Sequence, residues 1–255
     1  MLFIPIGLGA LTILFFFLGR GQGRKAYDIA VTETSDAAEL ESLSREVAAE
    51  LGAGSFASAA EVKGVVESPS PLQSEYARLP CVWYRSSITR EYETTEWERD
   101  SDGHRRSVTK RHTETVSSVE RSMPFLVRDQ SGTVEVDPEG AKLEGEKVMD
   151  RFEGSLPPEF GGPGPGGFGT LGYRIREEAL TIGRRVYVLG EARDEGGRLL
   201  IQKPSGKGGR FLITTKSEEE LLRSAKRGQG ALMAVAALCG ASALIVLALM
   251  ILKVI

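Results

Sequence analysis

Cysteine and histidine are scarce in this sequence. Its 255 residues include two of each, with no CxxC pair and no mixed cluster. Structural zinc sites need four such ligands at close spacing, so we expect no metal site, and nothing else in the sequence predicts a cofactor. A disulfide framework is excluded as well, because Cys239 lies inside an apolar run and Cys81 has no evident partner.

A surplus of basic residues is also missing. The formal net charge is −3, whereas nucleic-acid-binding domains carry a strongly basic face, so we expect no nucleic-acid partner. The glycine and proline run at 161–167 is not followed by Lys-Ser or Lys-Thr, which argues against a phosphate-binding loop. We expect the segment 154–172 to be a flexible loop, since its composition offers little apolar surface to bury.

Two long apolar runs are present, one near each end of the chain. Leu2–Leu18 and Ala231–Leu252 contain no charged residue, and about 20 apolar residues suffice to cross a bilayer. We predict an integral, two-pass membrane protein with transmembrane helices at 1–19 and 230–253, and with the lipid bilayer as a partner. A cleaved signal peptide is the alternative for the first run, but no Lys or Arg precedes Arg20.

The residues around the second run bear on orientation and assembly. Four small residues at 240–243 permit close helix packing, so a homo-oligomer through this span is an open alternative, although Gly230 and Gly240 are not spaced as a dimer motif. Lys and Arg concentrate in cytoplasmic flanks, and we therefore predict that the central domain faces the cytoplasm. The cations that flank the two runs on the side of that domain are Arg20, Arg24, Lys25, Arg223, Lys226 and Arg227.

The segment between the runs is typical of one helix followed by many strands. Ser35 or Asp36 is expected to cap an amphipathic juxtamembrane helix over 35–52, ended by Gly52. Residues 58–228 then alternate in polarity between turn-forming pairs, as strands do. The fold class is therefore α+β, a β-rich single domain between two transmembrane helices. The apolar stripe expected to pack the helix on this domain comprises Leu40, Leu43, Val47 and Leu51.

A long charged hairpin stands out within the domain. Strands are expected from Cys81 through Tyr92 and over 107–119, joined by a turn at Asp102-Gly103. The first arm is rich in Glu and the second in Lys and Arg, so we interpret the hairpin as a solvated ribbon stabilised by cross-strand ion pairs. Farther along, Ser217 and Glu220 form a capping box that predicts a helix to residue 227. Glycines at 228 and 230 are expected to form a hinge before the second span.

Candidate catalytic side chains are isolated in the sequence. Cys81 lies in an apolar strand, the environment of an inert buried thiol, and His112 has no partner that we can name. Carboxylates at Glu177, Glu178 and Glu191 could act as an acid–base set only if the fold brought them together. We therefore predict no catalytic, cofactor-binding or metal-binding residue.

Four motifs occur in order along the chain: Pro80-Cys-Val-Trp-Tyr-Arg85, the stretch Phe125–Pro138, Val186–Ala192 and Phe211–Leu221. With these motifs and the apolar runs, the chain from about Glu61 to Ile255 resembles the GIDE family, also called the "beside a membrane" (BAM) domain. That family includes organelle ubiquitin ligases, which hold the domain between two transmembrane helices. The motif positions, which we expect to be mostly structural, are Cys81, Trp83, Tyr84, Arg128, Asp129, Gly132, Asp137, Pro138, Gly190 and Glu191.

The sequence departs from the organelle ligases of this family in one respect. In the organelle ligases the activity resides in a RING domain after the second span, and a RING binds a pair of zinc ions, each through four Cys or His ligands. This sequence ends shortly after Leu252, so we expect a prokaryotic member without a RING. We predict a membrane-anchored, non-catalytic scaffold or sensor that binds an unknown protein or small ligand. The alternatives are a component of a ubiquitin ligase system and a membrane effector of a bacterial conflict system.

Overall fold

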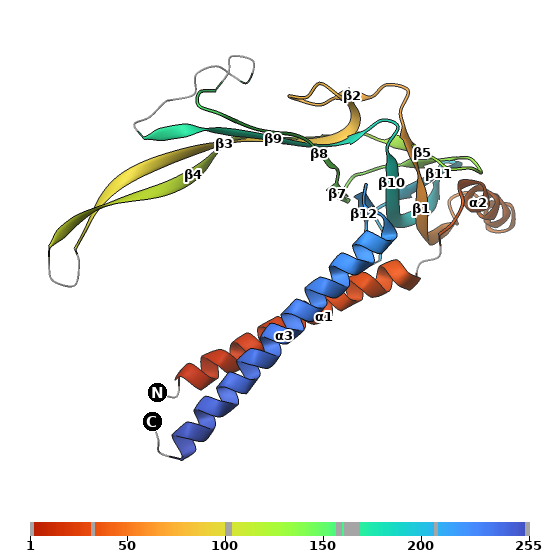
Figure 1. The fold of residues 1–255 in the computed structure, drawn as a ribbon. Helices are drawn as coiled ribbons and strands as arrows, with labels where there is room; N and C mark the ends of the chain where they lie inside the picture. The colour runs from red at the N-terminus through yellow and green to blue at the C-terminus, as the bar shows by residue number, and fades with distance from the viewer. Residues whose placement is uncertain are drawn as a thin grey trace. The chain divides into compact units, whose positions relative to one another are not determined.

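The computed structural model describes residues 3–31, 34–99, 104–156, 160, 169–206 and 209–252. The chain divides into two compact units. One contains the two ends of the chain, residues 1–34 and 216–255, and the other contains residues 35–215. The first unit is helical and the second is rich in strands (Figure 1).

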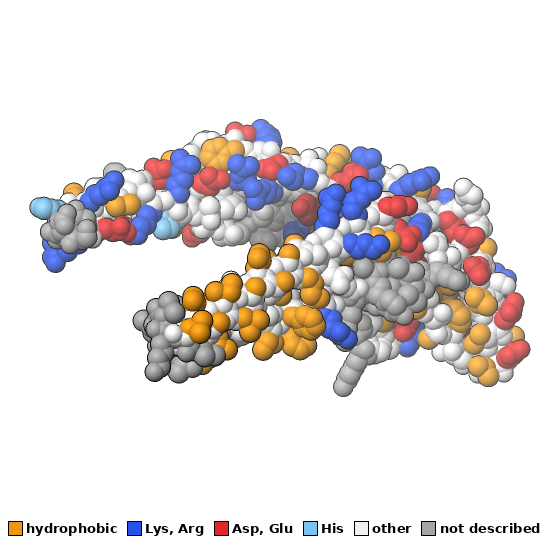
Figure 2. Space-filling view, turned by 60° about the horizontal axis from the view of Figure 1, so that its bottom comes forward, with side chains coloured by type: hydrophobic (Ala, Val, Ile, Leu, Met, Phe, Trp, Pro, Cys, Tyr) orange, Lys and Arg blue, Asp and Glu red, His pale blue; other side chains and the backbone are white. Residues whose placement is uncertain are grey.

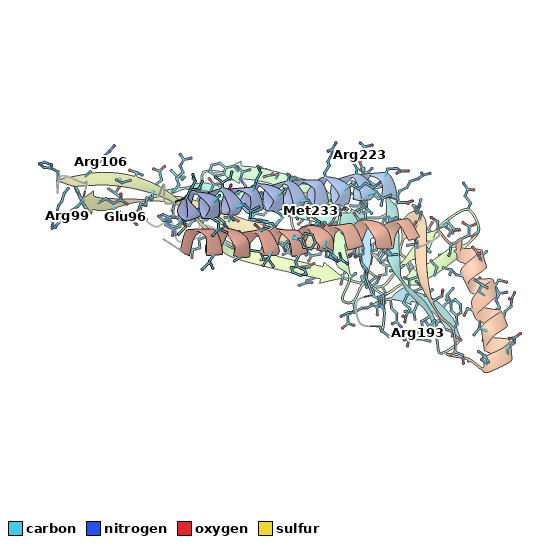
Figure 3. The ribbon with its side chains drawn as sticks, turned by 90° about the horizontal axis from the view of Figure 1, so that it is seen from below. Glu96, Arg99, Arg106, Arg193, Arg223 and Met233 are labelled. Atoms are coloured by element: carbon cyan, nitrogen blue, oxygen red, sulfur yellow. The ribbon has the colours of Figure 1, made fainter. Side chains whose placement is uncertain are left out.

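The helical unit consists of α1 (Phe3–Val31) and α3 (Glu218–Ile251). Gly19 lies against Met233, and Gly240 lies against Thr12, so the helices run antiparallel, with Met233 between them (Figure 3). Hydrophobic side chains cover the visible face of the pair (Figure 2). Both helices are long and apolar enough to cross a membrane.

Both helices extend farther than the sequence predicts. α1 continues past residue 19 to Val31, and α3 is uninterrupted from residue 218, so the predicted hinge at Gly228 and Gly230 is wrong. Each helical glycine costs roughly 1 kcal/mol relative to alanine. Contacts between the helices offset part of this cost, because Gly23 lies against Gln229 and Gly228 lies against Gln22.

The start of α3 follows the sequence prediction. The Ser217 hydroxyl accepts a hydrogen bond from the Glu220 backbone N–H, and the Glu220 carboxylate accepts one from the Ser217 N–H. This capping box is confirmed. It satisfies two N–H groups that would otherwise lack partners at a helix start. Since Lys216 and the residues after it belong to the helical unit, the predicted domain boundary at 228 lies inside α3.

The strand-rich unit contains two sheets, within the part of the chain that is described. The larger has the strand order β1-β5-β6-β11-β10-β12-β7, and β1 also pairs with β10. Its strands are β1 (Ala57–Glu67), β5 (Phe125–Arg128), β6 (Thr133–Val136), β7 (Lys142–Glu144), β10 (Arg185–Glu195), β11 (Arg198–Gln202) and β12 (Leu212–Thr214). The smaller has the order β2-β3-β9-β8, with β4 also paired to β3. Its strands are β2 (Leu72–Gln73), β3 (Pro80–Arg99), β4 (Arg105–Ser122), β8 (Glu146–Glu153) and β9 (Thr170–Thr181).

The core of this unit forms where alternating strand residues turn inward. Val62, Val188, Ile201 and Ile213 are fully buried, together with the indole of Trp83. Burying such a side chain contributes roughly 1.5–3 kcal/mol. Strand β9 begins at Thr170, so the end of the predicted loop at 154–172 is in fact strand. Most of that loop, residues 157–159 and 161–168, lies outside the described residues.

The predicted amphipathic helix is present as α2 (Ala37–Leu51), and half of its predicted stripe packs on the domain, because Leu40 is buried and Val47 packs against the core. The buried residues are Ala37, Leu40 and Ser44. Leu43 and Leu51, which the sequence assigns to the packed face, are 43% and 71% exposed. Spacings of three and four place 37, 40, 44 and 47 on one helix face, which is the face that packs on the core.

Candidate functional site

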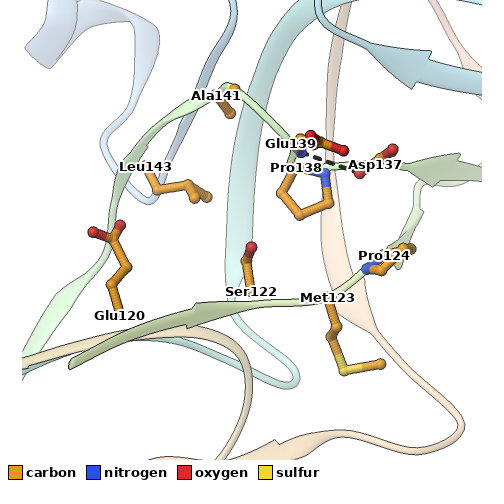
Figure 4. A pocket seen from close by; sticks show the side chains of 10 residues that line it. Glu120, Ser122, Met123, Pro124, Asp137, Pro138, Glu139, Ala141 and Leu143 are labelled. Atoms are coloured by element: carbon orange, nitrogen blue, oxygen red, sulfur yellow. Dashed lines mark hydrogen bonds between the residues drawn. The ribbon is translucent and has the colours of Figure 1, made fainter.

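A groove opens in the strand-rich unit where the end of β4 meets the segment that joins β6 to β7 (Figure 4). Its volume is about 560 Å³, within the range of small-ligand sites. Two of the predicted motif residues, Asp137 and Pro138, contribute to it. The groove is lined by Glu120, Ser122, Met123, Pro124, Asp137, Pro138, Glu139, Gly140, Ala141 and Leu143.

Glu120 is held at the groove by neighbours in the same sheet. Its carboxylate accepts hydrogen bonds from Trp83 Nε1 at 2.9 Å and from the Arg85 guanidinium at 2.8 and 3.1 Å. The hydrogen bonds from Arg85 lower the pKa of Glu120; partial burial opposes this, and Trp83 adds to it. Glu120 therefore remains a fixed carboxylate at neutral pH.

Asp137 shapes the opposite wall. Its side chain accepts a hydrogen bond from the Glu139 backbone N–H at 3.1 Å, and its own N–H donates to the Ile201 carbonyl at 3.0 Å. The Pro138 carbonyl accepts from Ala141 N–H at 3.0 Å. These bonds form a tight corner that leaves the Glu139 side chain exposed at the groove.

The groove is acidic in its lining. Three carboxylates and no Lys or Arg appear among the residues that line it, although Arg85 neutralises Glu120 and Lys203 packs on Gly140. Asp137 and Glu139 are the other two acidic residues of the lining. Such an arrangement suits a ligand group that is cationic or that donates hydrogen bonds.

Asp129, another motif residue, lies outside the groove, in the turn between β5 and β6. Its carboxylate accepts from the N–H groups of Ala37, Ser131 and Gly132 at 2.7, 2.7 and 2.8 Å, and from the Ser131 hydroxyl at 2.8 Å. Ser131 Oγ in turn accepts from Ala38 N–H at 3.0 Å. The turn between β5 and β6 thus caps the first two N–H groups of α2.

Burial and hydrogen bonding act in opposite directions on Asp129. Burial by itself raises its pKa, but the bonds from Ala37, Ser131 and Gly132 together hold that pKa below the usual value. Asp36, at the position that the sequence identifies as the cap, makes no capping hydrogen bond through its side chain to the described helix. The motif Asp129-x-x-Gly132 therefore holds the start of α2 against the β5–β6 turn.

Cys81 is fully buried in β3. Burial raises the pKa of its thiol to about 11, and the nearby Glu177 carboxylate adds to the rise. The thiol stays protonated at neutral pH, so it is a poor nucleophile.

The candidate carboxylates Glu177, Glu178 and Glu191 do not converge. Glu177 is buried, where it accepts from the N–H groups of Tyr76 and Ala77 and from the Ser86 hydroxyl. Its neighbour Glu178 is exposed on the other face of the same strand. Glu191 belongs to the other sheet. Glu177 organises the loop after β2 rather than forming an acid–base pair.

The remaining motif residues also contact other parts of the fold. The Tyr84 hydroxyl donates to Glu75 at 3.0 Å, Arg128 pairs with Glu67 at 2.7 Å, and Glu191 pairs with Arg193 at 2.8 Å. Gly190 lies where a Cβ atom would come within 2.9 Å of both Ile201 and Phe211. These contacts stabilise the two sheets.

The histidines lie apart from the groove, in β4 and just before it. His112 stacks on Tyr92 and shares a 2.9 Å hydrogen bond with Thr94, and His104 is exposed. Among the described residues, no group of three His, Cys, Asp or Glu side chains is placed to hold a metal ion.

Sequence reasoning missed most of the groove. Glu120, Met123 and Glu139 lie in segments that the sequence shows to be strand ends and corners. Nothing local indicates that these segments meet. The one available signal was the pair Asp137-Pro138, which ends β6 and turns the chain.

Comparison with known protein families gives a match. A protein-family model, GIDE, described as "E3 Ubiquitin ligase", matches residues 89–248, which is more than half of the chain. The match includes the groove and α3 down to Ala248, whereas the motif Pro80–Arg85 precedes it. No curated protein and no solved structure matches the chain.

Proposed function

The chain belongs to the GIDE family, and from this premise we propose that it is a membrane-tethered binding module without a catalytic step of its own. The observation that carries the proposal is the groove that Asp137 and Glu139 line at the corner between β6 and β7 (Figure 4). We infer that this groove takes a basic side chain of a partner protein. The side chains with catalytic potential support the same interpretation. The Cys81 thiol is buried and protonated, and the Glu177 carboxylate accepts backbone hydrogen bonds.

The tether is supplied by α1 and α3. Their outward side chains are large and apolar, including Phe17, Leu238 and Leu244, which are 65–69% exposed. Exposing so much apolar surface to water is unfavourable, whereas lipid accepts it. The hydroxyls of Thr12 and Ser242 bond to carbonyls of their own helices, as polar side chains do in a bilayer.

We place the strand-rich unit on the cytoplasmic side. The support is the basic flank of the helices, where Arg20, Arg223, Lys226 and Arg227 are all exposed. Proteolysis of intact and permeabilised cells tests this placement. Cleavage of the strand-rich unit only after permeabilisation is expected, and cleavage in intact cells would reverse the orientation.

The groove is tested by a photo-crosslinking residue introduced at Glu139, with Gln130 as the control position because it is exposed outside the groove. We expect a discrete cross-linked partner from position 139 alone. Asp137→Asn should weaken it, since this change removes the charge but keeps an oxygen to accept from Glu139 N–H. Equal products from both positions, or no effect of Asp137→Asn, would contradict a role for the groove.

The second candidate function is a component of a ubiquitin ligase system, which the family description favours. Two cysteines and two histidines cannot supply the zinc ligands of a RING. A ligase step would therefore need a RING from outside these 255 residues. Ubiquitin transfer by the reconstituted chain with activating and conjugating enzymes alone would refute the non-catalytic proposal. Transfer that appears only with a RING-bearing partner would support the second function.

A further inference from the structure

The outer half of the β3–β4 hairpin projects from its sheet as a ribbon. The register of β3 with β9 ends at Tyr92, and Glu93 N–H still donates to the Gly169 carbonyl at 2.8 Å. Within the described residues Thr94–Arg99 then pair with Arg105–Lys110 alone. At about 3.3 Å per residue the ribbon extends roughly 20 Å. Two strands alone are marginally stable in water, so cross-strand side-chain pairs decide whether the ribbon persists.

One face of the ribbon supplies these pairs. Lys110 contacts Glu96 at 2.8 Å and Glu98 at 2.6 Å, and it lowers the pKa of Glu96 through the hydrogen bond between them. Arg106 is on this same face, because it lies opposite Glu98 in the register. Figure 3 shows Glu96, Arg99 and Arg106 near the end of the hairpin. This face is balanced in charge.

The other face is different. Side chains alternate along a strand, so Trp97 and Arg99 share a face, and Arg105 joins them because it pairs with Arg99. We call these three residues the Trp97 face. The Trp97 side chain is 70% exposed, and both arginines are exposed. Among the described residues neither arginine has an acidic partner.

The positions of the two arginines lower the stability of the ribbon. Like charges directly opposite each other destabilise a strand pair, and Arg99 and Arg105 occupy such positions. An anion held between the two guanidinium groups would remove this repulsion. The exposed indole beside them adds an amphipathic ring, which favours the boundary between water and hydrocarbon.

We propose that the Trp97 face binds the headgroups of anionic phospholipids at the surface of the membrane. Guanidinium groups match phosphate oxygens in a bidentate geometry, and tryptophan concentrates at headgroup depth. Lipid is favoured over an acidic protein because a chain tethered by α1 and α3 always has a lipid surface near it. The inference rests on the proposed membrane tether.

The experiment uses the full chain in vesicles. Trp97 and Trp83 are its two tryptophans, and Trp83 is fully buried, so the signal of Trp97 is the difference between wild type and Trp97→Phe. Vesicles of phosphatidylcholine, with or without phosphatidylglycerol, carry brominated acyl chains that quench an indole only at the membrane. Flotation of the vesicles first establishes that the protein is in them. The variants are Arg99→Gln with Arg105→Gln, and Arg106→Gln as the matched control on the opposite face.

We expect quenching of Trp97 in the anionic vesicles and little in the zwitterionic ones. Loss of the two face arginines should weaken the contact about fivefold for each residue, whereas Arg106→Gln should leave it unchanged. Salt at about 1 M should reduce quenching by screening the charges.

Several results would overturn the assignment. Floated protein without quenching would refute the lipid contact while leaving the tether intact, whereas protein that does not float would refute the tether itself. Equal loss in Arg106→Gln would show a nonspecific charge effect. A shift of Trp97 emission with soluble polyglutamate, but no quenching by lipid, would assign the face to an acidic protein instead.

Discussion

Asp129 offers the sharpest test of how the fold is assembled. Asp129→Ala removes a carboxylate that accepts four hydrogen bonds, one of them from the first N–H group of α2. Asp36→Ala is the matched control, because Asp36 occupies the N-cap position yet makes no side-chain capping bond to α2. Both variants remove a carboxylate at the start of α2. Asp36 precedes the helix in the chain, whereas Asp129 contacts it from the β5–β6 turn.

The magnitude follows from the bonds that are lost. Loss of a capping acceptor costs about 1 kcal/mol, and leaving the Ser131 and Gly132 N–H groups without their charged partner costs about 1 kcal/mol each. We therefore expect Asp129→Ala to lower the free energy of unfolding by about 3 kcal/mol. Asp36→Ala should cost about 0.5 kcal/mol, its share of the helix dipole interaction.

Thermal unfolding of the detergent-solubilised chain in a Trp97→Phe background, followed by the fluorescence of buried Trp83, measures the difference. For a unit of this size, residues 35–215, each kcal/mol shifts Tm by about 2–4 °C. Asp129→Ala should thus lower Tm by about 6–12 °C. A larger loss from Asp36→Ala than from Asp129→Ala would refute the assignment of the cap to the β5–β6 turn.

The same carboxylate predicts a pH dependence. The pKa of Asp129 is lowered in the folded protein, so its stabilising contribution is present above the unfolded pKa, about 4, and is lost as pH falls through the folded value. The difference in free energy of unfolding between wild type and Asp129→Ala should therefore be largest at neutral pH and should decrease below about pH 4.

Three further predictions concern other parts of the chain. Cys81, with a pKa of about 11, should resist alkylation until the protein unfolds. Its contribution to stability should be complete below the unfolded thiol pKa and be lost as pH rises above that pKa toward the folded value of about 11; rapid labelling of folded protein would contradict its burial. Gly190→Ala should cost about 1–3 kcal/mol, because its Cβ would meet Ile201 and Phe211 at 2.9 Å, whereas Gly154→Ala, which meets nothing within 4 Å, should be tolerated in the same melt. Thr12→Cys with Gly240→Cys, in a chain lacking the native cysteines, should form an intrachain disulfide. Gly9→Cys with Gly240→Cys should not, and cross-links between differently tagged copies alone would show that α3 pairs between molecules.

Local signals predicted much of this fold. The alternation in β1 and β10 and the capping box at Ser217 each depend on residues close in sequence. The charged hairpin was also predicted, since Glu and Lys side chains at matched positions are visible in a strand pair. Burial of Cys81 followed from its apolar neighbours.

The errors arise where distant residues decide the outcome. Asp129 bonds to a residue 92 positions away, so no local pattern distinguishes it from a turn residue that merely bonds to itself. The glycines near the helix ends predict breaks, yet the opposite helix packs on Gly23 and Gly228 and the helices continue. The groove likewise depends on two segments meeting in space, which composition and periodicity cannot reveal.

The central claim is that lipid surrounds α1 and α3, and alkaline carbonate extraction followed by flotation of the membranes tests it most directly. The full chain should remain with the floating membranes. Leu238→Lys with Leu244→Lys should reduce this retention, because each cation at the centre of a span costs about 2.5–3.5 kcal/mol. Leu51→Lys, at a residue equally exposed on α2, should leave it unchanged. Recovery of the wild-type chain in the soluble fraction would contradict the account.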